Sequence, residues 1–580
     1  MKQKHFISEF VKSHKYTYLF GILFMFLSAY IQTLFPKVLG ETIDYLGLPS
    51  FDSKQVINYI VLMILIAIGT FITAFVWRNC IIRNARKLEC DLRERLFRHF
   101  QNLSPSFYNQ HKTGDLIAYA INDISAVRMT FGPATAMSIN GLSLCVAAIY
   151  SMARTIDWRL TLLCLLPIPL VVIIMLKIGN VIQRRFKRVQ ETFGKISDRV
   201  QENIYGIRVI KAYVQEESEL KRFETLNQEM LDANIKMVRV SSILSPVIEL
   251  CFSFSFVLNL IIGGKMVLEG VITLGDFVAF NTYLTMIMNP IISIGRIINI
   301  IQRGMASYHR LDDIFKVTPD LIEDQNPIVK DLKGEIRIED LTFTYPGSTQ
   351  PALHHLTFSV KPGQKIGIIG STGSGKTTLA NLLLRLYPIA ENQIYIDGID
   401  LNQYSIDSIR EGISYVPQDN FLFSATIEEN ITFFKSSYSQ ASLDYAVKMS
   451  CIEETIHQLP QGFKTKLGER GVNLSGGQKQ RLSIARALIR NPHVLILDDS
   501  LSAIDTITEK KILSHFEEIG REITMLIISH KISSVKDCDQ IIVLDKGHLV
   551  EQGTHEELIA KGGIYDGIYR QQSRDNEIQE

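Results

Sequence analysis

The sequence predicts an all-α membrane domain of six transmembrane helices followed by an α/β domain. Six runs of about 20 residues carry few or no charges, the length that a helix needs to cross ~30 Å of hydrocarbon. From residue 334 onward, short β-rich runs alternate with helical stretches, which is typical of an α/β domain. A glycine-rich loop between an apolar strand and a helix is the third indication.

The six apolar runs lack the polar face that a helix of a soluble protein shows at every turn. They therefore predict a multi-pass membrane protein. The runs are Tyr16–Phe35, Val56–Trp77, Met129–Ala153, Leu160–Leu176, Ser241–Gly264 and Phe277–Gly295.

The basic N-terminal segment precedes the first run. Phe6, Ile7, Phe10 and Val11 fall on one face of a short helix, so we expect an amphipathic segment at the membrane surface. A frayed polar tail is the alternative.

The distribution of Lys and Arg predicts the orientation, because cytoplasmic flanks carry the excess of these residues. The segments after the second and fourth runs are strongly basic, and both are expected in the cytoplasm together with the N-terminus. The short loops after the first, third and fifth runs are expected outside the cell, so Arg154 and Arg159, which flank the loop after the third run, are a small departure from the rule. The basic residues are Arg78, Arg83, Arg86, Lys87, Arg93, Arg95 and Arg98 in the first segment, and Lys177, Arg184, Arg185, Lys187 and Arg188 in the second.

The cytoplasmic connections are long. Arg78 to Arg128 and Lys177 to Val240 read as helix for much of their course, and ~25 helical residues would extend ~38 Å beyond the bilayer. Candidate turning points lie at Ser104–Tyr108 and Tyr205–Ala212. We expect these turns to transmit motion to the α/β domain, with a solvated helical hairpin as the alternative.

Composition limits the other possibilities. The net charge is +1, so the whole chain offers no electrostatic argument for nucleic acid as a partner. The seven cysteines show no CxxC pair or metal-ligand spacing, which favours small buried apolar residues over metal or disulfide chemistry.

Hydropathy and composition predict a membrane domain over residues 1–315, a polar linker with two prolines over 316–333, and the α/β domain over 334–580.

A phosphate-binding loop follows the apolar strand Lys365–Ile369 and leads into a helical pattern, which is the context that the motif GxxxxGK followed by Ser or Thr requires. Backbone N–H groups of such a loop wrap phosphates. Lys376 is expected to reach the β and γ phosphates of a bound nucleotide, and the Thr377 hydroxyl to ligate Mg²⁺. The predicted nucleotide-binding residues here are Gly370, Ser371, Thr372, Gly373, Ser374, Gly375, Lys376, Thr377 and Thr378.

A second apolar strand, Val494–Leu497, ends in Asp498 and Asp499. It would deliver carboxylates to the phosphate side of the sheet, where Asp498 would hold Mg²⁺ through water. Many apolar strands end in an acid, so this pattern alone is not specific.

A third motif decides the class. Leu474, Ser475, Gly476, Gly477 and Gln478 open a helix, which gives a second phosphate-binding surface in the same domain. This motif resembles the signature of ATP-binding cassette (ABC) domains, and with it the whole chain resembles a half-size ABC exporter of the multidrug and lipid-flippase type. The resemblance implies that the second surface caps the ATP held by a partner subunit.

Further positions match the family in order. By resemblance, Tyr345 stacks on adenine, Gln418 senses Mg²⁺ and water, and His530 contacts the γ phosphate. Ser502–Asp505 resembles the loop that crosses the dimer interface, and Gly468–Gly471 resembles the segment that senses the partner's membrane helices.

Position 499 departs from the family pattern, in which Glu polarises the attacking water. Asp499 is one methylene shorter, which withdraws the carboxylate by ~1.5 Å. We favour a heterodimer in which this chain pairs with a different half-transporter that has the Glu but an altered signature. One composite site would be slow and the other fast. The alternative is a homodimer with two equally sluggish sites.

The resemblance implies an ATP-hydrolysing translocase of the bacterial plasma membrane, with ATP and Mg²⁺ as cofactors and membrane lipid around it. The expected cargo is amphipathic or hydrophobic, as in multidrug export. A homodimeric lipid or peptide exporter is the alternative, and an ATP-gated channel or regulatory subunit is a further one. Importers of this family generally keep the membrane and ATPase parts on separate chains. The fusion of the two parts in one chain therefore argues against an importer.

Polar side chains within the apolar runs are costly and therefore candidates for the cargo cavity: Glu249, Asn259, Asn281, Asn289 and Arg296. Hydrogen bonding between helices is the alternative. Apolar cargo would suit the side chains of Phe252, Phe254, Phe256, Met286 and Met288, although packing against lipid explains them equally well.

Overall fold

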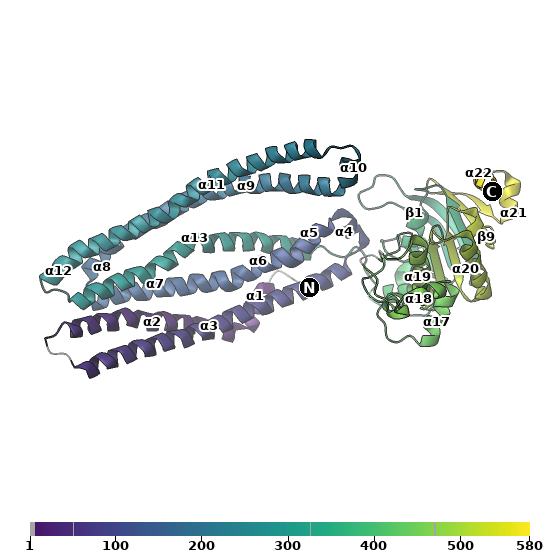
Figure 1. Ribbon diagram of the computed structural model, residues 1–580. Coiled ribbons are helices and arrows are strands. Elements are labelled where there is room, and N and C mark those ends of the chain that lie inside the picture. The colour runs from purple at the N-terminus through teal and green to yellow at the C-terminus, as the bar shows by residue number, and fades with distance from the viewer. Residues whose placement is uncertain (1–5, 50–51, 325, 469–470, 472, 580) are drawn as a thin grey trace. The chain divides into compact units, whose positions relative to one another are not determined.

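The computed structural model describes residues 6–49, 52–324, 326–468, 471 and 473–579. The chain forms two compact units (Figure 1). The first contains Met1–Gln101 and Thr113–Val317, and the second contains Asn102–Lys112 and Thr318–Glu580. Residues 102–112, which the sequence places in the membrane domain, thus pack with the second unit.

Six helical stretches of the first unit are long and apolar enough to span a membrane, among the residues that the structure describes, which confirms the six predicted spans. They are Lys15–Leu46, Ser53–Asn102, Thr113–Thr155, Trp158–Tyr205, Glu216–Leu268 and Leu274–Lys316. The helices of this unit, including three short π-helical turns η1, η2 and η3, are α1 (Phe6–Ser13), α2 (Lys15–Leu46), α3 (Ser53–Asn102), α5 (Thr113–Ala118), η1 (Tyr119–Asp123), α6 (Ile124–Met129), η2 (Thr130–Ala134), α7 (Thr135–Thr155), α8 (Trp158–Leu165), α9 (Pro167–Tyr205), α10 (Ile207–Ala212), α11 (Glu216–Leu258), η3 (Asn259–Gly263), α12 (Gly264–Leu268) and α13 (Leu274–Lys316).

The first unit contains two groups of packed helices. Helices α2, α7 and α13 pack against one another, and α9 and α11 run side by side as a long pair (Figure 1). The α2–α13 contact is close, because a Cβ atom at Gly275 would lie 2.0 Å from the backbone oxygen of Gly40. Asp44 fixes this end of α2, since its carboxylate accepts hydrogen bonds from the Thr273 hydroxyl (2.5 Å) and the Gly275 N–H (2.7 Å).

Both predicted turning points are short helices. In the second unit α4 spans Pro105–Gln110 and follows the 50-residue helix α3. In the first unit α10 spans Ile207–Ala212 and joins α9 to α11. At the N-terminus, α1 buries Ile7 and Phe10, and the Arg95 guanidinium lies 4.0 Å from the centre of the Phe6 ring.

The second unit contains two β-sheets. An antiparallel sheet has the strand order β2-β1-β4-β5, and a six-stranded sheet has the order β10-β9-β3-β8-β7-β6, in which only β10 is antiparallel to its neighbour. The strands are β1 (Ile336–Phe343), β2 (Leu353–Val360), β3 (Lys365–Gly370), β4 (Ile394–Ile396), β5 (Ile399–Asp400), β6 (Ile413–Val416), β7 (Val494–Asp498), β8 (Thr524–Ile528), β9 (Gln540–Asp545) and β10 (His548–Gly553).

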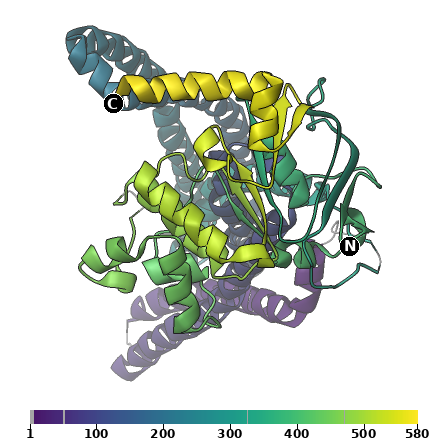
Figure 2. The same ribbon diagram turned by 90° about the vertical axis from the view of Figure 1, so that its right-hand side faces the viewer.

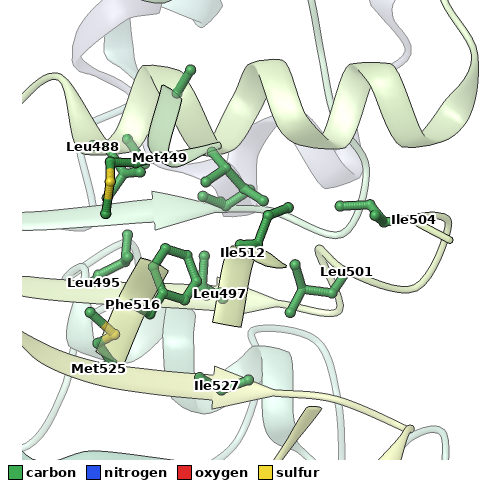
Figure 3. Close-up of a cluster of buried hydrophobic side chains, with 14 of the residues drawn as sticks. Met449, Leu488, Leu495, Leu497, Leu501, Ile504, Ile512, Phe516, Met525 and Ile527 are labelled. Atoms are coloured by element: carbon green, nitrogen blue, oxygen red, sulfur yellow. The ribbon is translucent and has the colours of Figure 1, made fainter. Parts of the chain in front are cut away.

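Both faces of the parallel strands are buried, which explains why they are nearly continuous apolar runs. Alternate residues of β7 point to opposite sides, so that Leu495 and Leu497 join one apolar cluster while Val494 and Ile496 join another. Figure 3 shows the first cluster, in which Leu495 and Leu497 lie near Phe516.

Helices cover these faces, and α22 lies at the C-terminal end of the chain (yellow in Figure 2). The longer helices of the second unit are α14 (Lys376–Leu383), α15 (Ile406–Gly412), α16 (Ile427–Thr432), α17 (Gln440–Met449), α18 (Glu453–Gln458), α19 (Gly476–Leu488), α20 (Thr506–Glu518), α21 (His555–Lys561) and α22 (Ile564–Gln579).

Candidate functional site

Four neighbouring parallel strands deliver the predicted nucleotide-binding residues to one edge of the sheet. The phosphate loop follows β3, His530 follows β8, Asp499 follows β7 and Gln418 follows β6. Because the strand order is β3-β8-β7-β6, their carboxyl ends lie next to one another. Ligands of open α/β sheets bind at the carboxyl ends of the strands, so the topology alone assembles the candidate site.

The phosphate loop turns tightly between β3 and α14. Gly373 and Gly375 have φ values of +80° and +100°, which glycine adopts without a Cβ clash. A Cβ atom at Gly375 would also lie 2.9 Å from the backbone oxygen of Ala352, and one at Gly370 would lie 2.1 Å from that of Leu544. These glycines are thus required by the fold of the loop itself.

Lys376 lies in the centre of the phosphate loop. Its amine is buried and donates to the backbone oxygens of Gly370 (2.8 Å) and Ser371 (2.9 Å). Burial lowers the pKa of Lys376, an effect that the nearby charges of Asp498 and Asp499 oppose. The ammonium of Lys376 is the group of this loop that fits a negatively charged phosphate chain.

Asp498 is the buried carboxylate of the site. Its Oδ2 atom accepts a hydrogen bond from the Tyr415 hydroxyl (3.1 Å), and Thr377 also hydrogen-bonds to it. Burial raises the pKa of Asp498, as does the charge of Asp499, while the hydrogen bonds from Thr377 and Tyr415 and the charge of Lys376 oppose the shift. The oxygens of Asp498 and Thr377 are the ligands that Mg²⁺ prefers, so these residues fit the ion.

Among the described residues, no group of three or more His, Cys, Asp and Glu side chains could hold a metal ion. This is compatible with Mg²⁺, which typically takes one or two protein ligands and completes its shell with water and substrate phosphates.

Asp499 is half-buried and directly follows β7. Its backbone has φ = +47°, a left-handed conformation that Asp adopts more readily than most other residues. The backbone N–H donates to Ile528 O (2.8 Å), which anchors the turn to β8. Its Oδ2 atom lies 3.4 Å from Gln418 Nε2, so the two residues assigned to water and Mg²⁺ are in contact.

Tyr345 and His530 are both half-buried. The Tyr345 hydroxyl donates to Thr378 Oγ1 at the start of α14 (3.0 Å), and its ring packs edge-on against Tyr387 with 5.1 Å between ring centres. The backbone oxygen of His530 accepts a hydrogen bond from Gln572 Nε2 (2.7 Å).

Comparison with known proteins identifies the family. Residues 18–291 match the model of the ABC transporter transmembrane region, and residues 353–502 match that of the ABC transporter domain. The chain is 37% identical, over 563 residues, to the probable multidrug resistance ABC transporter ATP-binding/permease protein YheI of Bacillus subtilis; the match covers 97% of this chain and 96% of YheI. The chain is an ABC exporter.

Two further relatives support this assignment. The exporter is 33% identical over 537 residues to the ATP-dependent lipid A-core flippase of Aromatoleum aromaticum, with 91% of this chain and 88% of the flippase covered. The solved structure of a bacterial Atm1-family ABC exporter with ATP bound has a TM-score of 0.79 and 27% identity, and covers 95% of this chain and 98% of that one. The exporter is therefore a half-size, multi-pass membrane ATPase.

The signature motif begins α19. Ser475 is the N-cap residue of this helix, and its hydroxyl accepts a hydrogen bond from the Gln478 N–H (3.3 Å) while Gln478 Oε1 accepts one from the Ser475 N–H (2.9 Å). Ser475 and Gln478 thus form a capping box. Within the described residues, no hydrogen bond or ion pair joins Ser475–Gln478 to Gly370–Thr378 of the same exporter chain.

The signature motif also packs against the loop Ser502–Asp505. A Cβ atom at Gly477 would lie 2.7 Å from the backbone oxygen of Ala503. The buried Gln480 accepts a hydrogen bond from the Ala503 N–H (2.9 Å) and donates to the Ser502 hydroxyl (3.2 Å). Within the segment Gly468–Gly471, Glu469 and Arg470 lie outside the described residues.

A cavity of about 700 Å³ opens in the membrane unit of the exporter. Of the five polar residues predicted to line a cargo cavity, Asn281 and Asn289 do so. Asn259 is buried and donates to Asn281 Oδ1 (3.0 Å), while Glu249 and Arg296 are exposed and do not line this cavity. Its polar lining consists of Gln32, Arg78, Asn140, Asn281, Thr282, Thr285, Asn289 and Ser293.

Of the apolar residues suggested for contact with cargo, one lines the cavity and the others do not. Met286 lines the cavity, whereas Phe252 is buried in the helix packing and Phe254 is 52% exposed. Phe256 and Met288 pack, partly buried, against the same apolar cluster as Phe252.

Sequence reasoning missed several residues of the exporter. Thr285 and Ser293 line the cavity but were not predicted. Together with the predicted Asn281 and Asn289 they are spaced by four along α13 and share one helix face, a signal that was available in the sequence. Tyr415, Gln480 and Gln572 were also missed, and no local spacing pattern marks them.

Proposed function

We propose that this exporter is one half of a heterodimer that moves amphipathic compounds, including drugs, across the plasma membrane at the expense of ATP. The N-terminus and the second unit face the cytoplasm in this proposal. The relatives named for multidrug resistance support the cargo class, and a cavity that combines amides and hydroxyls with apolar side chains suits a molecule with both polar and apolar parts.

In the proposed ATPase mechanism, the phosphate loop and Lys376 bind the phosphates and Tyr345 stacks on adenine. Asp498 and Thr377 would hold Mg²⁺, which neutralises charge on the phosphates. Asp499 and Gln418 orient the attacking water, and His530 contacts the γ phosphate. The signature motif of the other subunit completes the site in this proposal. Its support is that no hydrogen bond or ion pair joins Ser475–Gln478 to this chain's own phosphate loop among the described residues.

The proposed difference in hydrolysis rate between the two ATP sites rests on Asp499. A misplaced base can reduce hydrolysis ~100-fold, which needs only ~2.7 kcal/mol of lost transition-state stabilisation. The site built on Lys376, Asp498 and Asp499 would therefore be slow. The site that uses this chain's intact Ser475–Gln478 would be fast, provided that the partner supplies the glutamate.

A homodimeric exporter of lipids is the second candidate, and the similarity to a protein named as a lipid A-core flippase favours it. In that case both sites would carry Asp499 and would be equally slow. Peptide export, an ATP-gated channel and a regulatory subunit have no specific observation in their favour.

Transport into inside-out vesicles tests the export function. A fluorescent amphipath is expected to accumulate in vesicles that contain the co-expressed subunits when MgATP is added. Lys376→Ala in this chain is the matched control, and reduced accumulation is expected because one phosphate loop loses its cation. Nucleotide-dependent electrical conductance without accumulation would instead establish a channel.

A further inference from the structure

The C-terminal helix α22 is firmly anchored to the second unit. The carboxylate of Glu551, on β10, accepts hydrogen bonds from the backbone N–H groups of Ile564 (2.7 Å) and Tyr565 (3.0 Å), which are free at a helix start. The Tyr565 ring is fully buried in the apolar cluster beside the parallel sheet, and its hydroxyl lies 2.7 Å from His555 Nδ1. The start of α22 therefore has a fixed position.

Two turns further along α22, Gln572 holds the loop that carries His530. Its Nε2 atom donates to the His530 backbone oxygen (2.7 Å), and its Oε1 atom accepts from the Ile532 N–H (2.9 Å). Both partners are backbone groups with fixed roles, so they determine the orientation of the amide. One side chain thus holds the loop on both sides of Lys531.

The opposite side of this loop is held by α20 and by the loop that precedes it. The Ser534 hydroxyl donates to Glu509 Oε1 (2.5 Å), and Lys531 Nζ donates to the backbone oxygen of Ser502 (3.1 Å). Glu509 itself is buried. The His530 loop therefore lies between two helices, and Gln572 provides the hydrogen bonds between the loop and α22 among the described residues.

We propose that Gln572 is a positioning residue for ATP hydrolysis, which acts by holding the backbone of His530 so that its imidazole meets the γ phosphate. The inference rests on the proposed role of His530. Residue 572 lies 42 positions beyond residue 530, and it touches neither the phosphate loop nor the strand-end carboxylates among the described contacts. The proposal gives α22 a part in positioning His530, through the side chain of Gln572.

The chemistry of the amide gives an ordered series of variants. Gln572→Ala removes both hydrogen bonds. Gln572→Glu keeps the shape and can still accept from the Ile532 N–H, but it cannot donate to the His530 oxygen. Gln572→Asn withdraws the amide by ~1.5 Å. The matched control is Gln571→Ala, because Gln571 is the exposed neighbour of Gln572 on the same helix.

The test uses the assembled transporter and follows hydrolysis on this chain alone. Vanadate traps 8-azido-ADP only after hydrolysis, and the photolabel on this chain is then read from a gel. Loss of two neutral hydrogen bonds predicts about five- to tenfold less trapped label for Gln572→Ala and less label also for Gln572→Glu. Labelling by 8-azido-ATP at 4 °C without vanadate, which reports binding, is expected to stay within about twofold of wild type. Gln571→Ala is expected to match wild type in both assays.

A double variant separates positioning from a general structural role. If Gln572 acts through His530, Gln572→Ala causes no further loss of trapped label in a His530→Ala background. An equal further loss in that background would overturn the inference, as would wild-type trapping by Gln572→Ala. If Gln572→Ala fails to fold, the isosteric Gln572→Glu carries the same comparison. Full trapping by His530→Ala alone would instead refute the proposed role of His530.

Discussion

Asp499 combines an unusual side chain with an unusual backbone. The left-handed conformation at this position tolerates Asp, and the side chain reaches Gln418 at 3.4 Å. A carboxylate that is one methylene longer would extend ~1.5 Å further from the backbone. The local geometry therefore accommodates the shorter acid, while the chemistry of hydrolysis would favour the longer one.

The variant Asp499→Glu is expected to raise ATP hydrolysis by the site of this chain. A gain of up to ~100-fold follows from restoring the position of the base, with little change in the KM for ATP because substrate binding does not use this group. Steady-state ATPase of the purified chain measures the effect. Asp499→Asn is the control, and equal rates for all three proteins would mean that Asp499 is not the base.

The affinity for Mg²⁺ is expected to depend on pH through Asp498. Burial holds the pKa of Asp498 above its usual range, and Mg²⁺ needs the ionised carboxylate, so affinity is lost as pH falls through this raised pKa. Asp499→Asn removes a neighbouring negative charge that raises the pKa of Asp498, so the loss should move to lower pH. Mn²⁺ binding in the presence of ATP, followed by electron paramagnetic resonance, measures the midpoint. A midpoint that moves upward in Asp499→Asn would contradict this account.

The sequence predicts residues that belong to a compact local pattern. The phosphate loop is one, because a strand, a fixed glycine spacing and a helix occur within a few residues. Gln480 and Gln572 are different, since each is a single glutamine on a helix whose partners are distant in sequence. Their contacts become visible only once the strands have brought these loops together.

At the scale of elements, the start of α19 and the loop Ser502–Asp505 form one packed structure. Gly477 lies so close to Ala503 that a methyl group would meet the backbone oxygen at 2.7 Å, whereas a methyl group at Gly476 would lie 3.4 Å from the Ala503 Cβ atom. The signature motif and the loop Ser502–Asp505 should therefore move together.

Substitution of these two glycines tests that packing. Gly477→Ala is expected to destabilise the second unit by ~1–3 kcal/mol, the usual cost of overpacking, and to lower its unfolding temperature by several degrees. Gly476→Ala should have a clearly smaller effect. Differential scanning fluorimetry of the full chain compares the two, and equal unfolding temperatures would contradict the packing.

Helix α4 is connected through Tyr387 to Tyr345, the residue proposed to stack on adenine. Asn109 Nδ2 donates to the Tyr387 hydroxyl (3.1 Å), and the Tyr387 ring supports Tyr345. Tyr387→Ala is expected to weaken ATP binding about fivefold, because an aromatic contact is worth about 1 kcal/mol, while Tyr387→Phe should bind ATP nearly as wild type. A fluorescent ATP analogue measures both affinities. Equal affinities for Tyr387→Ala and wild type would mean that Tyr387 does not support the adenine site.

The sequence also predicts helices better than it predicts their faces. All six spans are present, yet only two of the five proposed cavity residues line the cavity. Glu249 and Arg296 were chosen because charge is costly in a membrane, but both are exposed in this chain and do not line the cavity. The spacing of four along α13 was the better guide, because it specifies a face rather than a residue type.

At the scale of the whole molecule, the two surfaces predicted to bind phosphate belong to one α/β unit. The phosphate loop lies at the carboxyl edge of the sheet, and the signature motif caps α19. The sequence predicts both, together with the order of membrane domain and ATPase domain. It does not identify the partner, because in the proposed dimer the residues that complete each pocket lie on another polypeptide.

The steady-state ATPase activity of this chain, purified without any other half-transporter, tests the asymmetric account most directly. Its homodimer would contain two intact signature motifs and two Asp499 carboxylates, so we expect residual hydrolysis roughly 100-fold below that of a competent exporter. Lys376→Ala defines the background. Turnover on the order of 1 s⁻¹ or faster by the chain alone would contradict the account, because Asp499 would then serve as an effective base.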